Sequence, residues 1–340
     1  MSVEVYDFRS DNVGGVAPEL LEALLAANRG TAAPYGDDDC THAMTARFRQ
    51  AFEHDGLAAF PLATGTGANA VALAILANPY GAIYCHETAH ILLEECGAPE
   101  FFTGGAELIG LPGAGGKLAP DLLAKAIVAT GAVVSLTQAT EWGTVYTPDE
   151  VRALASLAHA HGLAVHMDGA RFANAVAALD ADPKEFTWKL GIDVLSLGGS
   201  KNGLGFGDAV VFFDRQLADG FDRRCKQAGH LIANSHYISA GWVKYLADDL
   251  WKNNARHANA MAQALAAQLR KIPDVPILYP VEANSVFIRL DPDVLSRLNE
   301  LGWALYAFFG GEAVRLTCSW ATTHDAISKF IRDLQTALRK

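Results

Sequence analysis

A lysine and an aspartate each stand at the end of a short apolar run. Lys201 lies in GGSKNG, directly after DVLSL at 193–197, and Asp168 closes LAVHMD at 163–168. The carboxyl ends of parallel strands meet at one edge of an open sheet, and ligands bind at that edge. Alone, each residue has an ordinary interpretation, as a solvated loop lysine or as an aspartate that caps a helix. Together at one sheet edge, an amine and a buried acid can hold two parts of one small molecule.

A glycine-rich turn follows an earlier apolar run, AAFPLA at 58–63. In TGTGANA, Gly65 and Gly67 allow a tight turn into a predicted helix, and the free amides at such a helix start attract phosphate. The same letters fit the G-x-G-x-x-A fingerprint of dinucleotide-binding folds, which keeps a nicotinamide dehydrogenase as an alternative. That alternative gives no task to Lys201 or Asp168.

HETAH at 86–90 matches the zinc-protease motif H-E-x-x-H. The motif follows the apolar run AIYC, however, and Thr88 is a suitable helix N-cap, so His86 is expected outside the helix that begins here. The two histidines would then not share one helix face, as that zinc site requires. We therefore expect no metal site, with a zinc hydrolase kept as an alternative.

The elements that position these motifs alternate along the chain. Short apolar runs and helical patterns follow one another, as in an α/β sheet that is mostly parallel and covered by helices on both faces. The segment at 148–162 is typical of these helices, with a proline at its start and a glycine at its end. The seven predicted strands are 58–63, 82–85, 99–102, 132–138, 163–168, 193–197 and 209–213.

The pattern changes near residue 245. We expect a long helix at about 246–271 and a final helix, with strand-like runs at 285–290, 304–309 and 313–320. This predicts three parts: an N-terminal arm at 1–35, a large cofactor-binding domain at 36–245 that holds the seven-stranded sheet, and a small C-terminal α+β domain at 246–340.

The composition limits which compartment and which binding partners are expected for this protein. Of the 340 residues, 51% are hydrophobic and 19% are charged, which indicates a globular chain with a large core. The 27 basic and 38 acidic residues give a net charge of −11 without a basic stripe, so nucleic acid and anionic membranes are not expected as partners. Neither a membrane span nor a secretion signal is visible, and the five scattered cysteines suit reduced thiols in the cytoplasm.

One cofactor gives a task to all of these groups. Pyridoxal phosphate needs a phosphate site, a lysine that forms a Schiff base with its aldehyde, and a carboxylate that keeps its ring nitrogen protonated. The turn at Gly65, Lys201 and Asp168 supply these three, and His90 is placed to stack on the ring. The glycines beside Lys201 leave room for its long amine to move.

A family resemblance extends over nearly the whole chain. The sequence resembles the low-specificity L-threonine aldolases and the similar phenylserine aldolases, which belong to the β-eliminating lyase group of fold type I pyridoxal phosphate enzymes. The resemblance is most specific in HMDGARFANA (166–175) combined with DVLSLGGSKNG (193–203). It includes DFRSDN (7–12), PYGDD (34–38), ATGTGAN (63–69), ETAHILLEECGAPEFF (87–102), QATEWGTVYTPDE (138–150), RRCKQAG (223–229), PVEANSVF (280–287) and VRLTCSW (314–320).

This resemblance implies a reaction and a set of residue roles. The reaction is retro-aldol cleavage of the Cα–Cβ bond of L-threonine, L-allo-threonine or a related β-hydroxy-α-amino acid such as phenylserine, which gives glycine and an aldehyde. By position, the implied catalytic residues are Lys201, His90 and Asp168. The implied cofactor-binding residues are Gly65, Thr66, His90, Asp168, Arg171 and Lys201, and the substrate carboxylate would be bound by Ser10, Arg171 and Arg315. A guanidinium is well suited to clamp a carboxylate.

One family feature is missing from this chain. Many members carry a histidine in the loop before the fourth strand, near the substrate hydroxyl, but the segment at 122–138 contains none. The remaining candidates for the base that acts on this hydroxyl are His90, His86 and Glu87. Another lyase or a racemase that uses the same cofactor therefore stays an alternative, as does a binding protein without activity.

The resemblance also implies a homo-oligomer, either a dimer or a dimer of dimers, because fold type I sites are usually completed by a neighbouring subunit. The family's phosphate-binding arginine from that subunit has no secure match here. Lys226 and His236 are candidates for its place, and Tyr35 is a candidate to reach into a neighbouring site.

Overall fold

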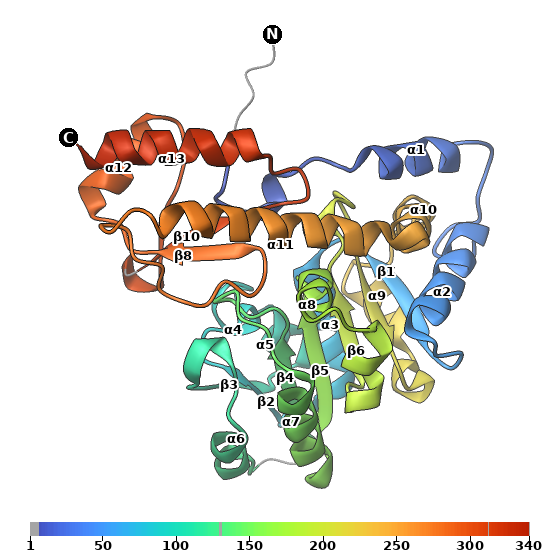
Figure 1. Ribbon diagram of the computed structural model, residues 1–340. Coiled ribbons are helices and arrows are strands. Elements are labelled where there is room, and N and C mark those ends of the chain that lie inside the picture. The colour runs from blue at the N-terminus through green and yellow to red at the C-terminus, as the bar shows by residue number, and fades with distance from the viewer. Residues whose placement is uncertain (1–6, 129–130, 312, 340) are drawn as a thin grey trace.

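The computed structural model describes residues 7–128, 131–311 and 313–339, and a seven-stranded sheet lies at its centre (Figure 1). The strand order is β1-β7-β6-β5-β4-β2-β3, and β7 runs antiparallel to both of its neighbours while the remaining pairs are parallel. The prediction of a mostly parallel sheet is confirmed. The strands are β1 (Ala58–Leu62), β2 (Ala82–His86), β3 (Glu107–Leu111), β4 (Val133–Thr137), β5 (Ala164–Gly169), β6 (Val194–Leu197) and β7 (Asp208–Phe212).

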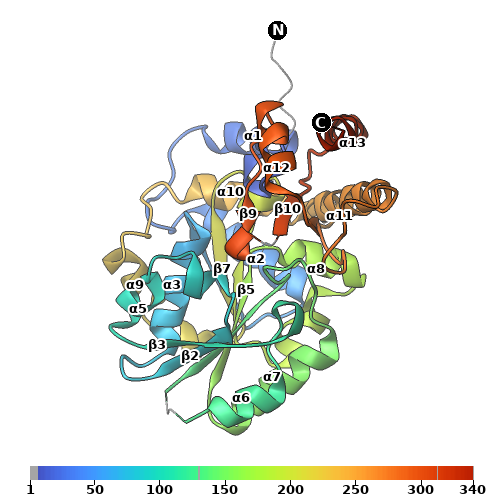
Figure 2. The same ribbon diagram turned by 90° about the vertical axis from the view of Figure 1, so that its left-hand side faces the viewer.

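Helices cover both faces of this sheet. Figure 2 shows α3, α5 and α9 on one side and α6, α7 and α8 on the other. The α-helices are α1 (Pro18–Ala27), α2 (Asp39–Phe52), α3 (Gly65–Leu76), α4 (His90–Leu93), α5 (Ala98–Thr103), α6 (Pro120–Ala126), α7 (Pro148–Ala160), α8 (Phe172–Leu179), α9 (Phe221–Gln227), α10 (His236–Tyr245), α11 (Leu250–Leu269), α12 (Pro292–Glu300) and α13 (His324–Leu338). The short 3-10 helices are η1 (Asp11–Val13), η2 (Ala114–Gly116), η3 (Pro183–Phe186), η4 (Trp188–Leu190), η5 (Ser200–Asn202), η6 (Arg215–Ala218), η7 (Ala247–Asp249) and η8 (Phe309–Gly311).

One of the predicted strands is wrong. Residues 99–102 lie inside helix α5, and the remaining strand of the sheet is β3 at Glu107–Leu111. Pro99 stands in the first turn of α5, where a proline favours the start of a helix, and glycines with positive φ flank both ends. Strand β3 lies at the edge of the sheet with exposed and half-buried side chains, so it lacks the buried apolar run that marks the other strands.

A second sheet has its own core toward the C-terminus. Its three antiparallel strands lie in the order β8 (Ser285–Ile288), β10 (Ala313–Thr317) and β9 (Ala307–Phe308), and their apolar side chains pack with those of α11, α12 and α13. Helix α11 begins at Leu250, later than predicted, because Asp248 and Asp249 adopt positive φ angles of 53° and 55° that interrupt the helical path. The domain boundaries given by the sequence remain predictions.

The segment before α1 connects the two sheets. Phe8 packs against Trp303 in the small core, and its carbonyl accepts the N–H of Thr317 at 2.7 Å. Further along the segment, the N–H of Ala17 donates to the carbonyl of Gly203 at 2.8 Å, one residue beyond η5. The N-terminal segment therefore contacts both β10 and the loop that carries Lys201.

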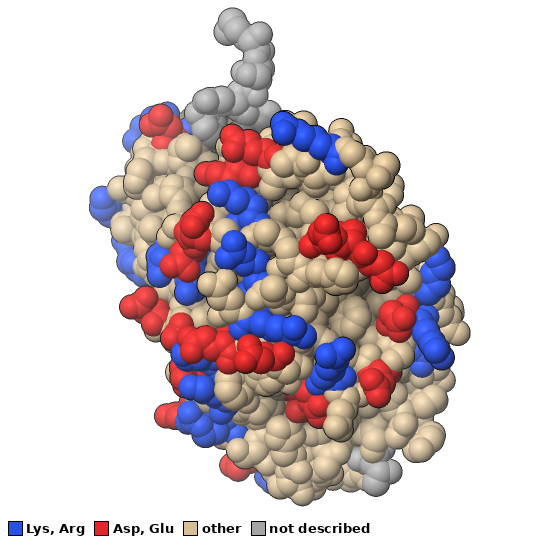
Figure 3. Space-filling view, turned by 90° about the vertical axis from the view of Figure 1, so that its right-hand side faces the viewer, with Lys and Arg blue, Asp and Glu red and all other residues tan. Residues whose placement is uncertain are grey.

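Acidic and basic side chains are interspersed on the face of the molecule that Figure 3 shows. This mixture fits a chain whose acidic residues outnumber its basic ones without a large field of one sign on that face. Among the described helices, none combines the length and the apolar character that a membrane crossing needs.

Candidate active site

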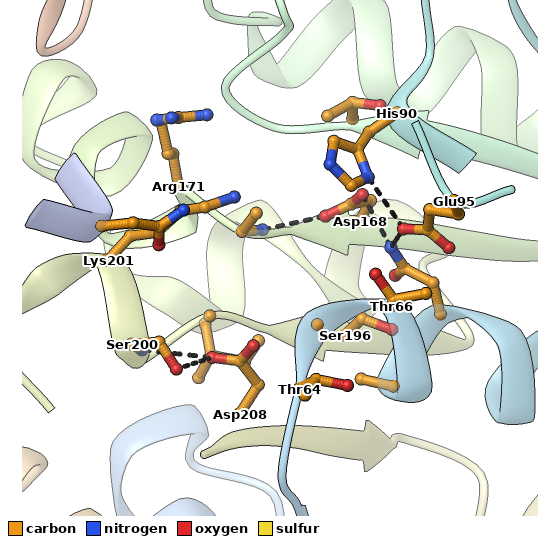
Figure 4. Close-up of a pocket in the computed structure, with 18 of the residues that line it drawn as sticks. Thr64, Thr66, His90, Glu95, Asp168, Arg171, Ser196, Ser200, Lys201 and Asp208 are labelled. Atoms are coloured by element: carbon orange, nitrogen blue, oxygen red, sulfur yellow. Dashed lines mark hydrogen bonds and ion pairs between the residues drawn. The ribbon is translucent and has the colours of Figure 1, made fainter. Parts of the chain in front are cut away.

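A cavity of about 380 Å³ opens at the carboxyl ends of the parallel strands, and both Lys201 and Asp168 line it (Figure 4). Its volume is typical of a small-molecule site. Ser10 is absent from the lining residues; its hydroxyl accepts the N–H of Asn12 at 3.2 Å, and Asn12 itself lines the cavity. The other residues expected in the site all line it: Gly65, Thr66, His90, Asp168, Arg171, Lys201 and Arg315.

The loop that carries Lys201 is fixed by Asp208. This carboxylate stands at the start of β7, and because β7 is antiparallel its first residue lies at the same sheet edge as the ends of β5 and β6. Its Oδ1 accepts the N–H groups of Gly199 at 2.8 Å and of Ser200 at 3.1 Å. A Cβ at Gly198 would collide with the backbone of Ala170, so only glycine fits where this loop passes the end of β5.

The amine of Lys201 lies in the cavity without a hydrogen bond or ion pair to any side chain or carbonyl of the described residues. Burial lowers its pKa, and the nearby positive charge of Arg171 lowers it further. A lysine with a lowered pKa keeps more of its amine in the neutral, nucleophilic form. Lys201 is therefore suited to form a covalent bond with a carbonyl compound.

A chain of hydrogen bonds links Asp168 to His90. Asp168 Oδ2 accepts a hydrogen bond from Asn69 Nδ2 at 2.9 Å, and the same nitrogen lies 2.9 Å from Glu95 Oε1. Glu95 Oε1 also lies 2.9 Å from Nδ1 of His90. Figure 4 marks this contact with a dashed line. The hydrogen bond to Glu95 raises the pKa of His90. The fully buried Glu95 therefore fixes the orientation of the imidazole and of the amide that holds Asp168.

The N-terminus of α3 forms an anion site at one end of the cavity. The Thr64 hydroxyl caps this helix by accepting the N–H of Gly67 at 3.1 Å. The amides of Gly65 and Thr66 donate no hydrogen bond to another described residue, and both residues line the cavity. Free amides at the start of a twelve-residue helix attract a phosphate group.

Arg171 is already paired with a buried carboxylate. Its Nε and one Nη donate to the two oxygens of Asp11 at 2.7 and 2.8 Å, and Asn284 donates to the same carboxylate at 3.0 Å. Burial would raise the pKa of Asp11, but the charges of Arg171 and Lys201 outweigh it and lower that pKa. Arg171 is thus held in place with only part of its guanidinium left for a ligand.

Arg315, by contrast, has no acidic partner among the described residues. It projects from β10 into the cavity, and its guanidinium lies 4.2 Å from the centre of the Phe308 ring. Its buried Nε finds no hydrogen-bond partner within the described part of the chain. Burial, followed by repulsion from Arg171, lowers its pKa to about 10. A buried cation of this kind favours the binding of an anion such as a carboxylate.

The HETAH residues lie on two different elements. His86 ends β2, where its Nδ1 lies 2.7 Å from the Thr88 hydroxyl and its Nε2 lies 3.0 Å from the Gly113 carbonyl oxygen. His90 begins α4, whose N-cap is Ala89; the prediction of Thr88 as the cap is wrong because its hydroxyl contacts His86 instead. Across the described residues, no group of three histidine, cysteine or acidic side chains could hold a metal ion.

Several lining residues were missed by the sequence analysis. Asn69 and Glu95 contact the predicted residues only through the fold, because 99 residues separate Asn69 from Asp168. Glu141 could have been found, since an acidic residue shortly after a buried strand is the signal that identified Asp168. Asp208 stands before a strand instead of after one, and it lies at this edge because β7 is antiparallel.

The groups that line this cavity fit pyridoxal phosphate. The free amides at the start of α3 suit its phosphate, the unpaired amine of Lys201 suits its aldehyde, and the buried Asp168 suits a protonated ring nitrogen. Four buried atoms of lining residues have no hydrogen-bond partner among the described residues: Nε of Arg315, Oδ1 of Asn69, Oε2 of Glu95 and Oε2 of Glu141. They indicate that a polar ligand completes the site.

Comparison with known proteins agrees with this geometry. The model of the beta-eliminating lyase family matches residues 7–292. The low specificity L-threonine aldolase of Pseudomonas sp. (strain NCIMB 10558) is 42% identical over 99% of both chains, and the Escherichia coli K12 enzyme of the same name is 29% identical over 86% of this chain and 87% of its own. A threonine aldolase structure from Leishmania major covers 97% of this chain and 99% of its own, with 25% identity and a TM-score of 0.90. A Sphingomonas wittichii serine palmitoyltransferase shares the fold, with a TM-score of 0.76 at 14% identity, and covers 98% of this chain and 87% of its own.

The fold and the lysine–aspartate cavity define a fold type I enzyme that depends on pyridoxal phosphate. Within that class the match extends over most of the chain and includes the segments that carry Lys201 and Asp168. The chain belongs to the beta-eliminating lyase family.

Proposed function

We propose that this enzyme cleaves the Cα–Cβ bond of L-threonine, L-allo-threonine or a related β-hydroxy-α-amino acid such as phenylserine, giving glycine and an aldehyde. One observation carries the proposal. A buried aspartate lines one cavity together with a lysine and an arginine that have no acidic partner in the described ranges, in a chain 42% identical to a low specificity L-threonine aldolase. The arginine supplies what an amino acid substrate needs, a partner for its carboxylate.

Each residue then has a separate task. Bound pyridoxal phosphate supplies an electron-accepting ring that stabilises negative charge at the substrate Cα. Lys201 would hold the cofactor covalently until the substrate's amino group takes its place, and Asp168 would keep a proton on the ring nitrogen. The amides of Gly65 and Thr66 would bind the phosphate, and His90 would stack on the ring.

Substrate orientation falls to Arg315 and the free edge of Arg171. Arg315 binds the substrate carboxylate, and the Asp11 contact keeps Arg171 in position beside it. Fixing the carboxylate selects which of the Cα bonds is aligned for cleavage, and this choice determines the reaction. Ser10 has no direct role in this proposal, because it does not line the cavity and its hydroxyl accepts the N–H of the lining residue Asn12.

The proposal is tested with the purified holoenzyme. L-Threonine, L-allo-threonine and phenylserine are offered separately, and at least one should yield glycine and its aldehyde in equal amounts. If the enzyme exchanges the Cα proton or inverts the configuration at Cα but forms no aldehyde, it is a racemase and not an aldolase. No glycine from any β-hydroxy amino acid would refute the proposal.

Arg315→Lys should raise KM for the amino acid by about 10- to 100-fold, with a smaller effect on kcat. The lysine keeps a positive charge but loses the two-pronged contact, which is worth roughly 1.5–3 kcal/mol for a charged hydrogen-bonding group. Initial rates over a range of substrate concentrations separate the two constants. Arg256→Lys, at a side chain that is 48% exposed, serves as the matched control and should change neither. An unchanged KM for Arg315→Lys would remove Arg315 from the carboxylate site.

We also propose that the enzyme is a cytoplasmic homo-oligomer, a dimer or a dimer of dimers. A second hollow of about 560 Å³ adjoins the cavity, and its apolar residues Leu21, Leu25 and Phe206 are 47%, 69% and 43% exposed. Phe206 and Ala63 line both spaces, so a subunit that covers the hollow would also border the cavity. Sedimentation of the active enzyme tests this, and a stable active monomer would contradict it. Cell fractionation tests the compartment.

A further inference from the structure

A glutamate just beyond strand β4 enters the same cavity as Lys201 and Asp168. Glu141 follows the end of β4 by four residues and lines the cavity. Its Oε1 accepts the backbone N–H of His90 at 2.8 Å, which holds the carboxyl against the start of α4. Its Oε2 is buried without a hydrogen-bond partner among the described residues. Oε1 therefore anchors the side chain, and Oε2, with the Thr137 side chain near the carboxyl, can still accept a hydrogen bond from a ligand.

The charges around Glu141 decide its protonation. Burial raises its pKa to about 7, with a further contribution from the negative charge of Asp168 on β5. Hydrogen bonds from the His90 N–H, from its own backbone N–H and from the Thr137 side chain oppose the shift. Arg171 lies close enough to feel its charge, and so do Cys85 and Tyr146. A carboxyl with a pKa near neutrality can both accept and return a proton under ordinary conditions.

The other candidates for a base are less suitable. His86 has both ring nitrogens in contact with other groups, the Thr88 hydroxyl and the Gly113 carbonyl, and it does not line the cavity. Glu87 is exposed and is likewise absent from the lining. His90 does line the cavity, but its contact with Glu95 raises its pKa, so more of its imidazole is already protonated. Glu141 is the lining residue best placed to receive a proton.

We propose that the carboxylate of Glu141 is the catalytic base that takes the proton from the substrate's β-hydroxyl. This inference rests on the proposed function. As the O–H proton moves to Glu141, the oxygen forms the second bond of the aldehyde carbonyl and the Cα–Cβ bond breaks, leaving its electron pair at Cα. Cα then takes up one proton to give glycine, and Glu141 releases its own, so no proton is consumed overall.

Glu141→Gln separates this step from the rest of the chemistry. The amide oxygen can still accept the His90 N–H, so the local structure is kept, but the side chain no longer takes a proton. We expect kcat for cleavage of a β-hydroxy amino acid to fall by about 10²- to 10³-fold, the usual size for loss of a general base, with KM changed less than ~3-fold. Exchange of the Cα proton of glycine with deuterated water needs no β-hydroxyl, and it should slow by less than ~3-fold.

The pH dependence gives a second signature. Because the base acts when deprotonated, kcat/KM of the wild type should rise with pH through a midpoint near the pKa of about 7, and Glu141→Gln should lose this limb. Infrared difference spectra of the holoenzyme should show one carboxyl that titrates near that pH and disappears in the variant, which is a readout independent of turnover.

Matched measurements make the outcome decisive. Glu107→Gln, at an exposed glutamate of β3 that does not line the cavity, should keep the wild-type rate and pH profile. If Glu141→Gln keeps both its cleavage rate and the rise of kcat/KM with pH, the assignment is overturned. Equal losses of cleavage and of glycine exchange would also overturn it, because they would show a general defect of the site. If the wild type cleaves no β-hydroxy amino acid, the proposed function fails and this inference fails with it; if it does and Glu141→Gln is normal, only the inference fails.

Discussion

Lys201→Ala should abolish aldehyde formation, with kcat reduced by at least ~10³-fold, because the variant loses both the nucleophile and a group that moves protons. Alanine leaves the neighbouring contacts of Asp208 with the loop intact, since they involve Gly199 and Ser200. The variant should therefore fold and still bind the cofactor through the start of α3. Steady-state assays of aldehyde release measure the loss.

Borohydride makes this result specific to the covalent link. After reduction, the wild type should gain the mass of one cofactor on the peptide that contains Lys201, while Lys201→Ala should gain none. Lys189→Ala, at a lysine that is 39% exposed and paired with Glu185, is the control and should behave as the wild type. Cofactor fixed to another lysine, or more than ~10% residual activity, would show that Lys201 is not the linking residue.

Asp168→Asn should lower kcat by about 10²-fold or more and weaken cofactor binding. The change removes the negative charge that would hold a proton on the ring nitrogen, and a charged hydrogen bond of this kind is worth roughly 1.5–3 kcal/mol before its effect on the reaction itself. The new amide also faces Asn69 Nδ2, a donor that now bonds Asp168 Oδ2. Titration with pyridoxal phosphate and assays at saturating cofactor separate the binding loss from the loss in kcat.

Asp149→Asn provides the matched control for this substitution. The Asp149 side chain is 93% exposed and pairs only with Arg152 three residues away, so its loss should be silent. A wild-type kcat for Asp168→Asn at saturating cofactor would mean that the buried acid is structural and that the ring nitrogen is held by another group.

The parts of this site that could be read from the sequence are those marked by strand ends. Asp168 ends a buried apolar run, and Lys201 and the turn at Gly65 each follow one. The carboxyl ends of parallel strands lie at one edge of a sheet whatever the order of the strands, so these residues could be expected to lie together. His90 was predicted from its place after the second strand, and the role of Arg315 came from the family resemblance. The structure adds that Arg315 lies over the Phe308 ring and that His90 contacts Glu95.

The remainder could not be predicted because it depends on contacts between distant segments. No local pattern shows that Asn69 bridges Glu95 and Asp168, or that Asp11 pairs with an arginine 160 residues away. Strand β3 was missed for a different reason, since an edge strand is only partly buried and its sequence carries a weak apolar signal.

The N-terminal segment has a consequence for how the enzyme meets its substrate. It is bonded to β10 through Phe8, to Arg171 through Asp11 and to the Lys201 loop through Ala17. Drawing the Arg315 strand away from Lys201 would load this segment, which includes the buried Asp11–Arg171 pair. Under the proposed function, this segment would tie the arginine that binds the substrate carboxylate to the loop of the reactive amine before any amino acid arrives, which would favour recognition by a preformed site.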